Sequence, residues 1–379
     1  MPKESINIKK EKDFIPISKP SITLKEVEYV NDAVKSGWVS SIGKYIELFE
    51  KNFAKYCNVK YALSTSNATV GLHLSLVALG IKEKDEVIIP DITFIATANS
   101  VKYTGAKVVI VDINKNTLCI EPKVIEKAIN SKTKAIIAVH LYGHPADLIK
   151  INEIAKKYNL YVIEDAAEAL GAEIQGKKIG GFGDIGVFSF YGNKIITTGE
   201  GGMITTNDEK LYNKMLYLRD HAMSKEKRYW HTEVGFNYRM TNLQAALGVA
   251  QLERIDELLY KKRLIFNWYK EKLGNFKDIK INYQAKWAKN VYWMICLQIE
   301  NFNEIQRDRF MQKLKKKGID SRPFFYPISD MPMYNDIKCN TPISHFIYQR
   351  GLNLPSFFDI TEEQVEYICS EIIEELNLF

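Results

Sequence analysis

Long apolar segments are missing from this chain of 379 residues. No run approaches the roughly 18 apolar residues that a transmembrane helix requires. The first residues, MPKESINIKKEKD, are charged and contain no apolar stretch, so we expect no secretory signal there. Cysteine is also scarce: the five cysteines are scattered, and none forms a CxxC pair. These absences predict a protein that spans no membrane and works in a reducing compartment, the cytoplasm.

Strong charge bias is missing as well. The net charge is +6, but lysine and arginine are mixed with acidic residues along the chain and form no basic stripe. This pattern argues against nucleic acid as a partner. It leaves open either an ordinary mixed surface or a local basic pocket for an anionic ligand.

Several ligand-binding motifs are absent too. The stretch GKKIGGFGDIG has no GxGxxG after a strand and no GxxxxGK[ST], which excludes the common dinucleotide and P-loop sites. His140 and His144 are four residues apart, a spacing that suits a metal on a helix. Here the segment leaves a strand and meets Pro145, so we expect no metal site.

The chain does contain a regular alternation of short β-branched runs and helical stretches. Nearly continuous apolar strands separated by helices predict an α/β fold, with a mostly parallel seven-stranded sheet between helices. Only residues 192–201 join the last two strands, which is too short for a helical crossover, so we expect one antiparallel neighbour there. The expected strands are 61–65, 85–90, 106–113, 134–141, 160–166, 186–191 and 202–207.

The character of the sequence changes after about residue 245. Residues 243–273 read as one long helix or two in succession, and a strand at 293–300 is followed by helices at 307–318 and 361–376. We expect a large domain over residues 1–250, including an N-terminal helix at 23–37, and a smaller α+β domain over residues 251–379.

Three features converge at the carboxyl ends of the predicted strands, where open α/β sheets bind ligands. Asp165 ends one strand, and Lys194 lies just past the next, before the turn GEGG. Ser66–Thr69 opens a helix whose free N–H groups suit a phosphate. Each feature alone has an ordinary alternative: a solvated lysine, a surface carboxylate, a plain N-cap.

Together these features predict a site for pyridoxal phosphate (PLP). A lysine amine forms a Schiff base with its aldehyde. A buried aspartate keeps the pyridine nitrogen protonated, which makes the ring an electron sink. The helix N-terminus binds the phosphate. The glycine turn then reverses the chain and holds Lys194 at the cleft.

The motifs EDAAEALGA, GDIGVFSFYGNKIITTGEGGMITTND and VGFNYRMTNLQAALGVAQLERID resemble those of the DegT-type sugar-nucleotide aminotransferases, which belong to fold type I of the PLP enzymes. The similarity covers almost the whole chain. Within the family, GFGDIGVFSFYGNK, YWHTEVGFNYRMTN and RPFFYP are most similar to the GDP-perosamine synthase group. That resemblance implies transfer of an amino group from L-glutamate to the C4 keto group of GDP-4-keto-6-deoxymannose, a step toward the O-antigen of lipopolysaccharide.

The resemblance implies roles for individual residues at the cofactor. Lys194 corresponds to the Schiff-base lysine and Asp165 to the aspartate at the pyridine nitrogen. Glu168 lies where many members have Gln or His near the ring hydroxyl, and its protonation state stays open. The expected phosphate ligands are Ser189 and the amides of Ala68 and Thr69.

Other matches concern the ring, the partner subunit and the substrate. Phe94 corresponds to the aromatic residue stacked on the pyridine ring. Asn237 corresponds to an asparagine that reaches the phosphate of the neighbouring subunit, which implies a homodimer with shared active sites. Arg322 and Lys44 are candidates for binding the anionic substrates, although either could be an ordinary surface residue. RPFFYP could equally serve core packing.

One departure from the family pattern is SNAT where SNGT or SGT is usual. Ala68 is harmless if it has helical backbone angles, which we expect at a helix start. Two functional alternatives stay open: amination of a UDP- or dTDP-linked keto sugar, and a PLP-binding homologue that does not aminate. Lys194 favours amination, because the resembling dehydratases have histidine at that position.

Overall fold

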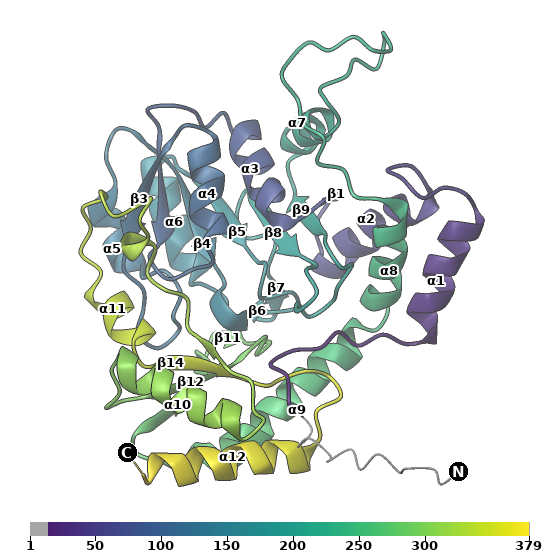
Figure 1. Cartoon of the computed structure of the whole chain (residues 1–379). Coiled ribbons are helices and arrows are strands. Elements are labelled where there is room, and N and C mark those ends of the chain that lie inside the picture. Colours follow the sequence, from purple (N-terminus) through teal and green to yellow (C-terminus); the bar gives the residue numbers. More distant parts are fainter. Residues whose placement is uncertain (1–13, 379) are drawn as a thin grey trace, which may run out of the picture.

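The computed structural model describes residues 14–378, and a seven-stranded sheet forms its centre (Figure 1). The strand order is β1-β9-β8-β5-β4-β2-β3. All seven predicted strands are present, and each differs from its predicted bounds by no more than a few residues. They are β1 (Tyr61–Thr65), β2 (Glu86–Pro90), β3 (Lys107–Val111), β4 (Thr133–Val139), β5 (Tyr161–Asp165), β8 (Ile185–Ser189) and β9 (Gly202–Thr206).

β9 is the one strand of this sheet that runs against the others. It pairs antiparallel with both β8 and β1, whereas β2–β3, β2–β4, β4–β5 and β5–β8 are parallel pairs. The prediction of an antiparallel neighbour at this point is confirmed. The register places Gly202 opposite both Ser189 and Thr65, so three strands meet at the same edge.

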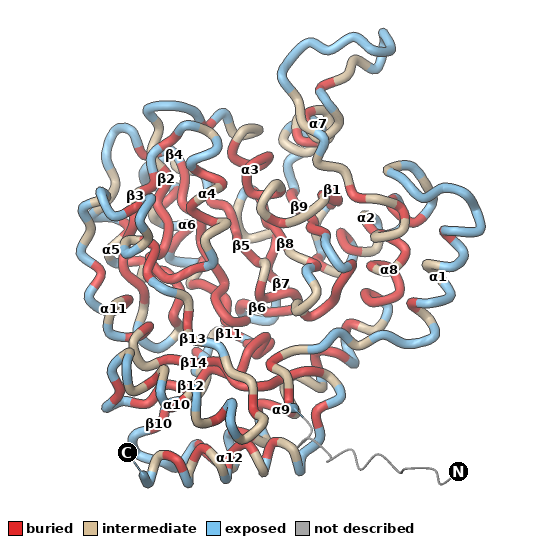
Figure 2. Tube along the Cα trace, in the orientation of Figure 1, coloured by how far each residue is buried: buried red, intermediate tan, exposed pale blue. Residues whose placement is uncertain are grey.

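Helices cover both faces of the sheet, because successive strand residues point to opposite sides. Ile88 belongs to the core on one face, and its neighbours Val87 and Ile89 to the core on the other. α3 (Ala68–Ala78), α4 (Ala96–Tyr103) and α7 (Glu209–Arg219) pack on the second face. α2 (Lys44–Cys57), α5 (Pro122–Ala128), α6 (Leu148–Tyr158) and α8 (Asn242–Leu252) pack on the first. Buried residues accordingly fill the sheet in Figure 2.

A second, antiparallel sheet with the order β10-β12-β14-β13 lies below the large one in Figure 1. Its apolar residues form a third core with the helices beside it. The smaller α+β region predicted at the C-terminus is therefore present. Its elements are β10 (Ile279–Ile281), β12 (Ile295–Ile299), β13 (Arg322–Pro323), β14 (Gly351–Leu354), α9 (Ile255–Leu273), α10 (Glu304–Lys316) and α12 (Glu362–Leu376).

The remaining elements are short, apart from the N-terminal helix. They are α1 (Leu24–Lys35), the 3₁₀ turns η1 (Leu141–Gly143) and η2 (Ile328–Asp330), α11 (Pro342–Tyr348), and a small sheet of β6 (Glu173–Ile174), β7 (Lys177–Lys178) and β11 (Ala288–Lys289). Four helices, α1, α8, α10 and α12, begin with a capping box, in which a Thr or Asn side chain and a Glu or Gln three residues later satisfy free N–H groups.

The N-terminal segment reaches the region of the small sheet, where Ile15 N–H donates to Gly318 O at 2.8 Å. Residues 243–273 form two successive helices, with α8 ending at Leu252 and α9 beginning at Ile255. The division into domains at residue 250 stays a prediction, and the expectation about a secretory signal concerns residues 1–13, outside the described range. Within residues 14–378, no helix is both long enough and apolar enough to cross a membrane.

Candidate active site

A cavity of about 730 Å³ opens at the carboxyl ends of the large sheet. Asp165 ends β5, Ser189 ends β8, and α3 begins just after β1, so the sheet itself brings these residues to one edge. Of the ten residues that the sequence predicts for a site, eight line this cavity: Ala68, Thr69, Phe94, Asp165, Glu168, Ser189, Lys194 and Arg322.

Lys194 lies in the turn between β8 and β9. Its N–H donates to Tyr191 O at 2.9 Å, and Phe190 N–H donates to Gly201 O at 2.9 Å, which closes the turn. The Lys194 side chain is only 13% exposed, and its Nζ lies 3.6 Å from Glu168 Oε1. Burial lowers the pKa of Lys194, while the nearby carboxylates of Glu168 and Asp165 raise it. A lysine with a lowered pKa is more readily neutral, which is the form that acts as a nucleophile.

Asp165 is 6% exposed and is held by hydrogen bonds. Thr97 Oγ1 donates to Asp165 Oδ2 at 2.7 Å, and Ala167 N–H donates to Oδ1 at 3.3 Å. Because Thr97 gives its proton to Asp165, Thr93 Oγ1 donates to Thr97 Oγ1 across 2.9 Å. Burial raises the pKa of Asp165, and the bond from Thr97 opposes this. The carboxylate is thus fixed in orientation and borders the cavity.

Glu168 is held between Lys194 and the backbone of η1. Tyr142 N–H donates to Glu168 Oε2 at 2.9 Å, which leaves Oε1 on the side of Lys194. Tyr142 has a φ of 53°, a left-handed conformation that is rare for a bulky residue. Such strain persists where the surrounding structure enforces it, often at functional sites. Burial raises the pKa of Glu168, and the charge of Lys194 lowers it.

The helix that follows β1 offers N–H groups to the same cavity. Asn67 caps α3, with its Oδ1 accepting from Val70 N–H at 3.0 Å. Ala68 and Thr69 line the cavity, and helix geometry leaves their N–H groups without acceptors inside the helix. Ala68 is the first residue of α3 and has no positive φ, so the expected helical conformation is confirmed. These N–H groups and the helix dipole together suit a phosphate.

Two of the glycines after Lys194 are required for different structural reasons. Gly199 has a φ of 79°, which favours glycine in the turn. A Cβ at Gly202 would lie 2.8 Å from Ala68 N and 2.7 Å from Thr65 Oγ1, so a side chain there would push against the start of α3. The absence of a side chain at Gly202 keeps the helix N-terminus and the strand ends close together.

Aromatic rings and one cation complete the wall. Phe94 is 57% exposed, and its ring lies 5.9 Å from that of Phe325. The ring of Phe325 stacks on that of Tyr142 at 5.4 Å. Arg322 on β13 is exposed, and its Nη2 lies 3.4 Å from Asp320 Oδ2. At that distance the guanidinium is only loosely held by Asp320.

Asn237 and Lys44 do not line the cavity of their own chain. Asn237 is exposed, and its Oδ1 accepts from Arg239 Nε at 3.1 Å. Lys44 Nζ lies 2.8 Å from Asp32 Oδ2, and its side chain is 68% exposed. The prediction for Asn237 concerns a neighbouring subunit, so a single chain does not test it. The role of Lys44 likewise stays a prediction.

Three residues at the site escape sequence reasoning: Thr97, Tyr142 and Trp293. Thr97 binds Asp165, Tyr142 binds Glu168, and the ring centroid of Trp293 lies 3.8 Å from Lys194 Nζ. The position of Thr97 in the first turn of α4, three residues after Phe94, is a signal that could have found it. Trp293 has no comparable signal, because its contact with Lys194 depends on how the small sheet packs on the large one. Tyr142 and Glu168 follow the neighbouring strands β4 and β5, so their contact lies within the large sheet's own edge.

His140 and His144 serve the architecture of the strand edge. His140 Nδ1 accepts from Ala146 N–H at 2.8 Å, so the proton lies on Nε2, which faces Glu164 Oε2 at 3.3 Å. His144 Nε2 accepts from Ala285 N–H at 3.1 Å. Both histidines are thereby engaged by neighbouring groups of the protein.

With the geometry in place, comparison with known proteins decides the family. The model of the DegT/DnrJ/EryC1/StrS aminotransferase family matches residues 20–373. This chain belongs to that family. The resemblance drawn from the motifs is confirmed, and the family is one of aminotransferases, so the chain is an enzyme of that class.

Relatives of this aminotransferase align over nearly their full lengths. The GDP-perosamine synthase of Escherichia coli O157:H7 is 47% identical over 361 residues, which are 95% of this chain and 98% of the relative. The GDP-perosamine synthase of Vibrio cholerae is 42% identical and covers 96% of this chain and 100% of the relative. Among solved structures, the PLP form of Spr1654 from Streptococcus pneumoniae, named as a sugar aminotransferase, has a TM-score of 0.90 at 26% identity. The match covers 95% of this chain and 97% of that one.

Proposed function

We propose that this aminotransferase uses PLP to transfer an amino group from L-glutamate to the C4 keto group of GDP-4-keto-6-deoxymannose, which yields GDP-perosamine. The observation that carries the chemistry is the meeting of Lys194, Asp165 and the N-terminus of α3 in one cavity. Two relatives named GDP-perosamine synthase, at 47% and 42% identity over nearly the whole chain, support the substrate. Such a product would enter the O-antigen of lipopolysaccharide.

The cavity residues fit PLP in charge and in chemistry. PLP combines a phosphate, a basic ring nitrogen and an aldehyde. The cavity offers free N–H groups at a helix start, a buried carboxylate and a half-buried amine, and its volume of about 730 Å³ is shared by the cofactor and the substrate. The PLP form of Spr1654 supports the same cofactor.

A different set of residues would bind each group of the cofactor. The N–H groups of Ala68 and Thr69 and the hydroxyl of Ser189 would bind the phosphate. Asp165 would hold the ring nitrogen in its protonated form. Glu168 would lie at the ring hydroxyl and Phe94 on the ring face. Lys194 would carry the cofactor covalently through Nζ.

When bound, PLP supplies an electron sink for negative charge at the neighbouring carbon. Lys194 Nζ would carry a proton from Cα of glutamate to the cofactor in the first half-reaction, and from the cofactor to C4 of the sugar in the second. Glu168 Oε1, 3.6 Å away, would stabilise the cationic form of Lys194 during each of these transfers. Both half-reactions use one site, which predicts ping-pong kinetics.

The two substrates are anionic, since glutamate carries carboxylates and the nucleotide sugar a diphosphate. Arg322 borders the cavity and is loosely paired, so we propose that it binds one of these groups. Lys44 remains the second candidate. It pairs with Asp32 and does not line this cavity, so it would act from a partner subunit.

We also propose a homodimer with composite active sites. The loop that follows α7 projects from the body in Figure 1 and is mostly exposed in Figure 2. The loop carries exposed apolar residues, and so do α1 and the segment that follows α1 in the sequence. These residues are Leu24, Val27, Val34, Trp38, Ile42, Tyr229, Trp230 and Val234. Exposed apolar surface of this kind favours association. Asn237, at the base of the loop, would then reach the phosphate in the partner subunit.

A substrate panel tests the proposal. The purified enzyme is incubated with ¹⁵N-glutamate and GDP-, UDP- or dTDP-linked 4-keto-6-deoxy sugars, and products are read by mass spectrometry. Label in the GDP-sugar is expected. Label only in a UDP- or dTDP-sugar would refute the substrate and keep the chemistry, and no label in any sugar would favour a homologue that does not aminate. The five free cysteines fit the proposed cytoplasmic location.

A further inference from the structure

Trp293 contacts Lys194 closely and has no part in the function proposed so far. Its ring centroid lies 3.8 Å from Lys194 Nζ, and the residue is 3% exposed. Its indole N–H donates to the backbone oxygen of Asn193 at 2.8 Å. That oxygen belongs to the peptide bond that joins Asn193 to Lys194. One side chain therefore contacts both the amine of Lys194 and the backbone that carries it.

A second half-buried lysine, Lys262, holds the backbone of Trp293. Lys262 on α9 donates to Trp293 O at 2.9 Å and to Ser356 Oγ at 3.0 Å, and it also donates to Ser356 O. Within residues 14–378, no acidic side chain forms an ion pair with Lys262, and its neighbours on α9, Lys261 and Arg263, are cations. A buried amine needs hydrogen-bond partners. These oxygens supply them, so Lys262 ties the backbone of Trp293 to α9.

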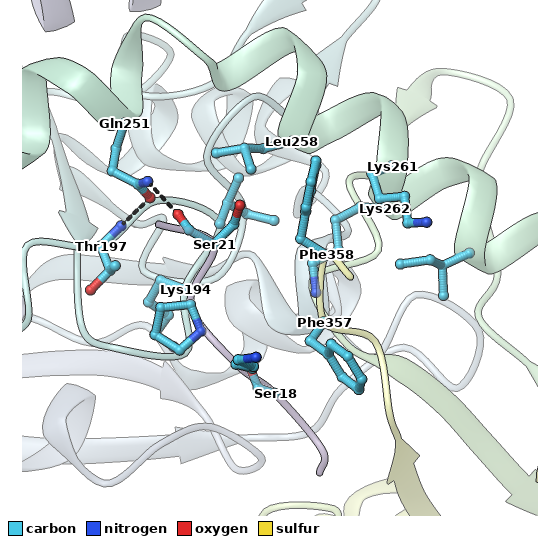
Figure 3. A pocket seen from close by; sticks show the side chains of 14 residues that line it. Ser18, Ser21, Lys194, Thr197, Gln251, Leu258, Lys261, Lys262, Phe357 and Phe358 are labelled. Carbon is cyan, nitrogen blue, oxygen red and sulfur yellow. Dashed lines mark hydrogen bonds between the residues drawn. The ribbon is translucent and has the colours of Figure 1, made fainter. Parts of the chain in front are cut away.

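Both lysines border one small cavity behind the active site. It measures about 30 Å³, and Figure 3 shows Lys194 and Lys262 among the residues around it. Gln251 closes a neighbouring side: its Oε1 accepts from Thr197 N–H at 3.2 Å, and its Nε2 donates to Ser21 O at 2.8 Å. Lys194 is thus supported from behind by packed residues of α8, α9 and the N-terminal segment.

We infer that Trp293 is a positioning residue for Lys194, anchored by Lys262, and that it governs how Lys194 presents its nitrogen to the cofactor. The inference rests on the proposed function. The face of an indole ring attracts a cation, so Trp293 favours the protonated nitrogen and opposes the burial that lowers the pKa of Lys194. The other titratable groups around the large cavity are Tyr103, Tyr142, Asp165, Glu168, Tyr191, Glu200 and Arg322.

Absorbance of the PLP-loaded enzyme across pH reports the protonation of the nitrogen that joins PLP to Lys194. Trp293→Leu removes both the ring and the N–H. The midpoint of the absorbance titration of this variant should fall by about 0.5 to 1.5 pH units. Trp293→Phe keeps an aromatic face, so its midpoint should fall by less than half as much. Lys262→Met should shift the midpoint in the same direction through loss of the anchor. Trp268→Leu is the matched control, since Trp268 stacks under Lys261 at 4.7 Å but lines neither the large nor the small cavity.

The titrations are repeated in the Glu168→Gln background, which removes the carboxylate closest to Lys194 Nζ. The shift caused by Trp293→Leu should persist there. A midpoint within about 0.2 pH units of the parent in both backgrounds would overturn the inference. Borohydride reduction and peptide mapping accompany each variant. A tag on Lys194 with no shift refutes the inference alone, whereas a tag on another lysine refutes the proposed function.

Discussion

Asp165→Asn tests the electronic role that the site assigns to its buried carboxylate. Asparagine keeps the size of the side chain and removes the charge. At an effective dielectric constant of about 20, two unit charges about 4 Å apart attract by about 4 kcal/mol. The loss of even three quarters of this from the transition state lowers turnover about 10²-fold, since each ~1.4 kcal/mol is a factor of ten. The expected loss is therefore 10²-fold or more, with PLP still bound through its phosphate.

The assay is a single turnover of PLP-loaded enzyme with glutamate, followed by the change in visible absorbance. Asp91→Asn is the matched control: Asp91 is a buried aspartate just past β2 that accepts hydrogen bonds from Ser329 and does not line the cavity. Asp91→Asn should lower stability and leave the chemical step nearly unchanged. Turnover of Asp165→Asn within about threefold of the parent would contradict the role of this carboxylate.

Three further outcomes are expected. Lys194→Ala should bind PLP without a covalent bond and lose turnover, while borohydride should tag Lys194 in the parent enzyme; a tag elsewhere contradicts this. Thr97→Val should move the acidic limb of the kcat/KM profile to higher pH, because it removes a donor that lowers the pKa of Asp165, and Thr97→Ser should restore the limb. An acidic limb at the same pH as in the parent enzyme would contradict the proposed effect of Thr97 on the pKa of Asp165. Mixing Lys194→Ala with Asn237→Ala subunits should restore activity, since mixed dimers hold one intact site. No recovery, with a monomer in sedimentation, would exclude the shared site.

The sheet could be predicted well because its strands are short, apolar and separated by helices. The register then explains why the strand-end residues meet: Asp165 lies opposite Val139 and Val187 on the neighbouring strands. The link between β8 and β9 is too short for a helical crossover, so its length alone predicts the antiparallel pair. The prediction omitted α2, although Tyr45, Phe49 and Phe53 recur on one helical face and are buried.

The candidate site could be predicted where the chain itself carries a residue to the strand edge. Lys194, Asp165 and the start of α3 meet this condition, so rules about strand ends and helix N-termini were enough. The roles of Glu168 and Phe94 could be predicted only from the family resemblance. Their roles toward the cofactor stay proposals, although the structure places both at the cavity.

The site residues that could not be predicted contact residues that are far from them in the sequence. Trp293 lies in a segment predicted as strand, but β12 begins only at Ile295. Lys262 of α9 holds the backbone oxygen of Trp293, and α9 itself begins in the core of the large sheet and continues on the small one. No local pattern encodes a contact between residues so far apart. The small region therefore does more than cover the cofactor cavity: through Trp293 it forms the wall against which the amine of Lys194 rests. A rearrangement of the small region would change the environment of Lys194 without touching the strands that present it.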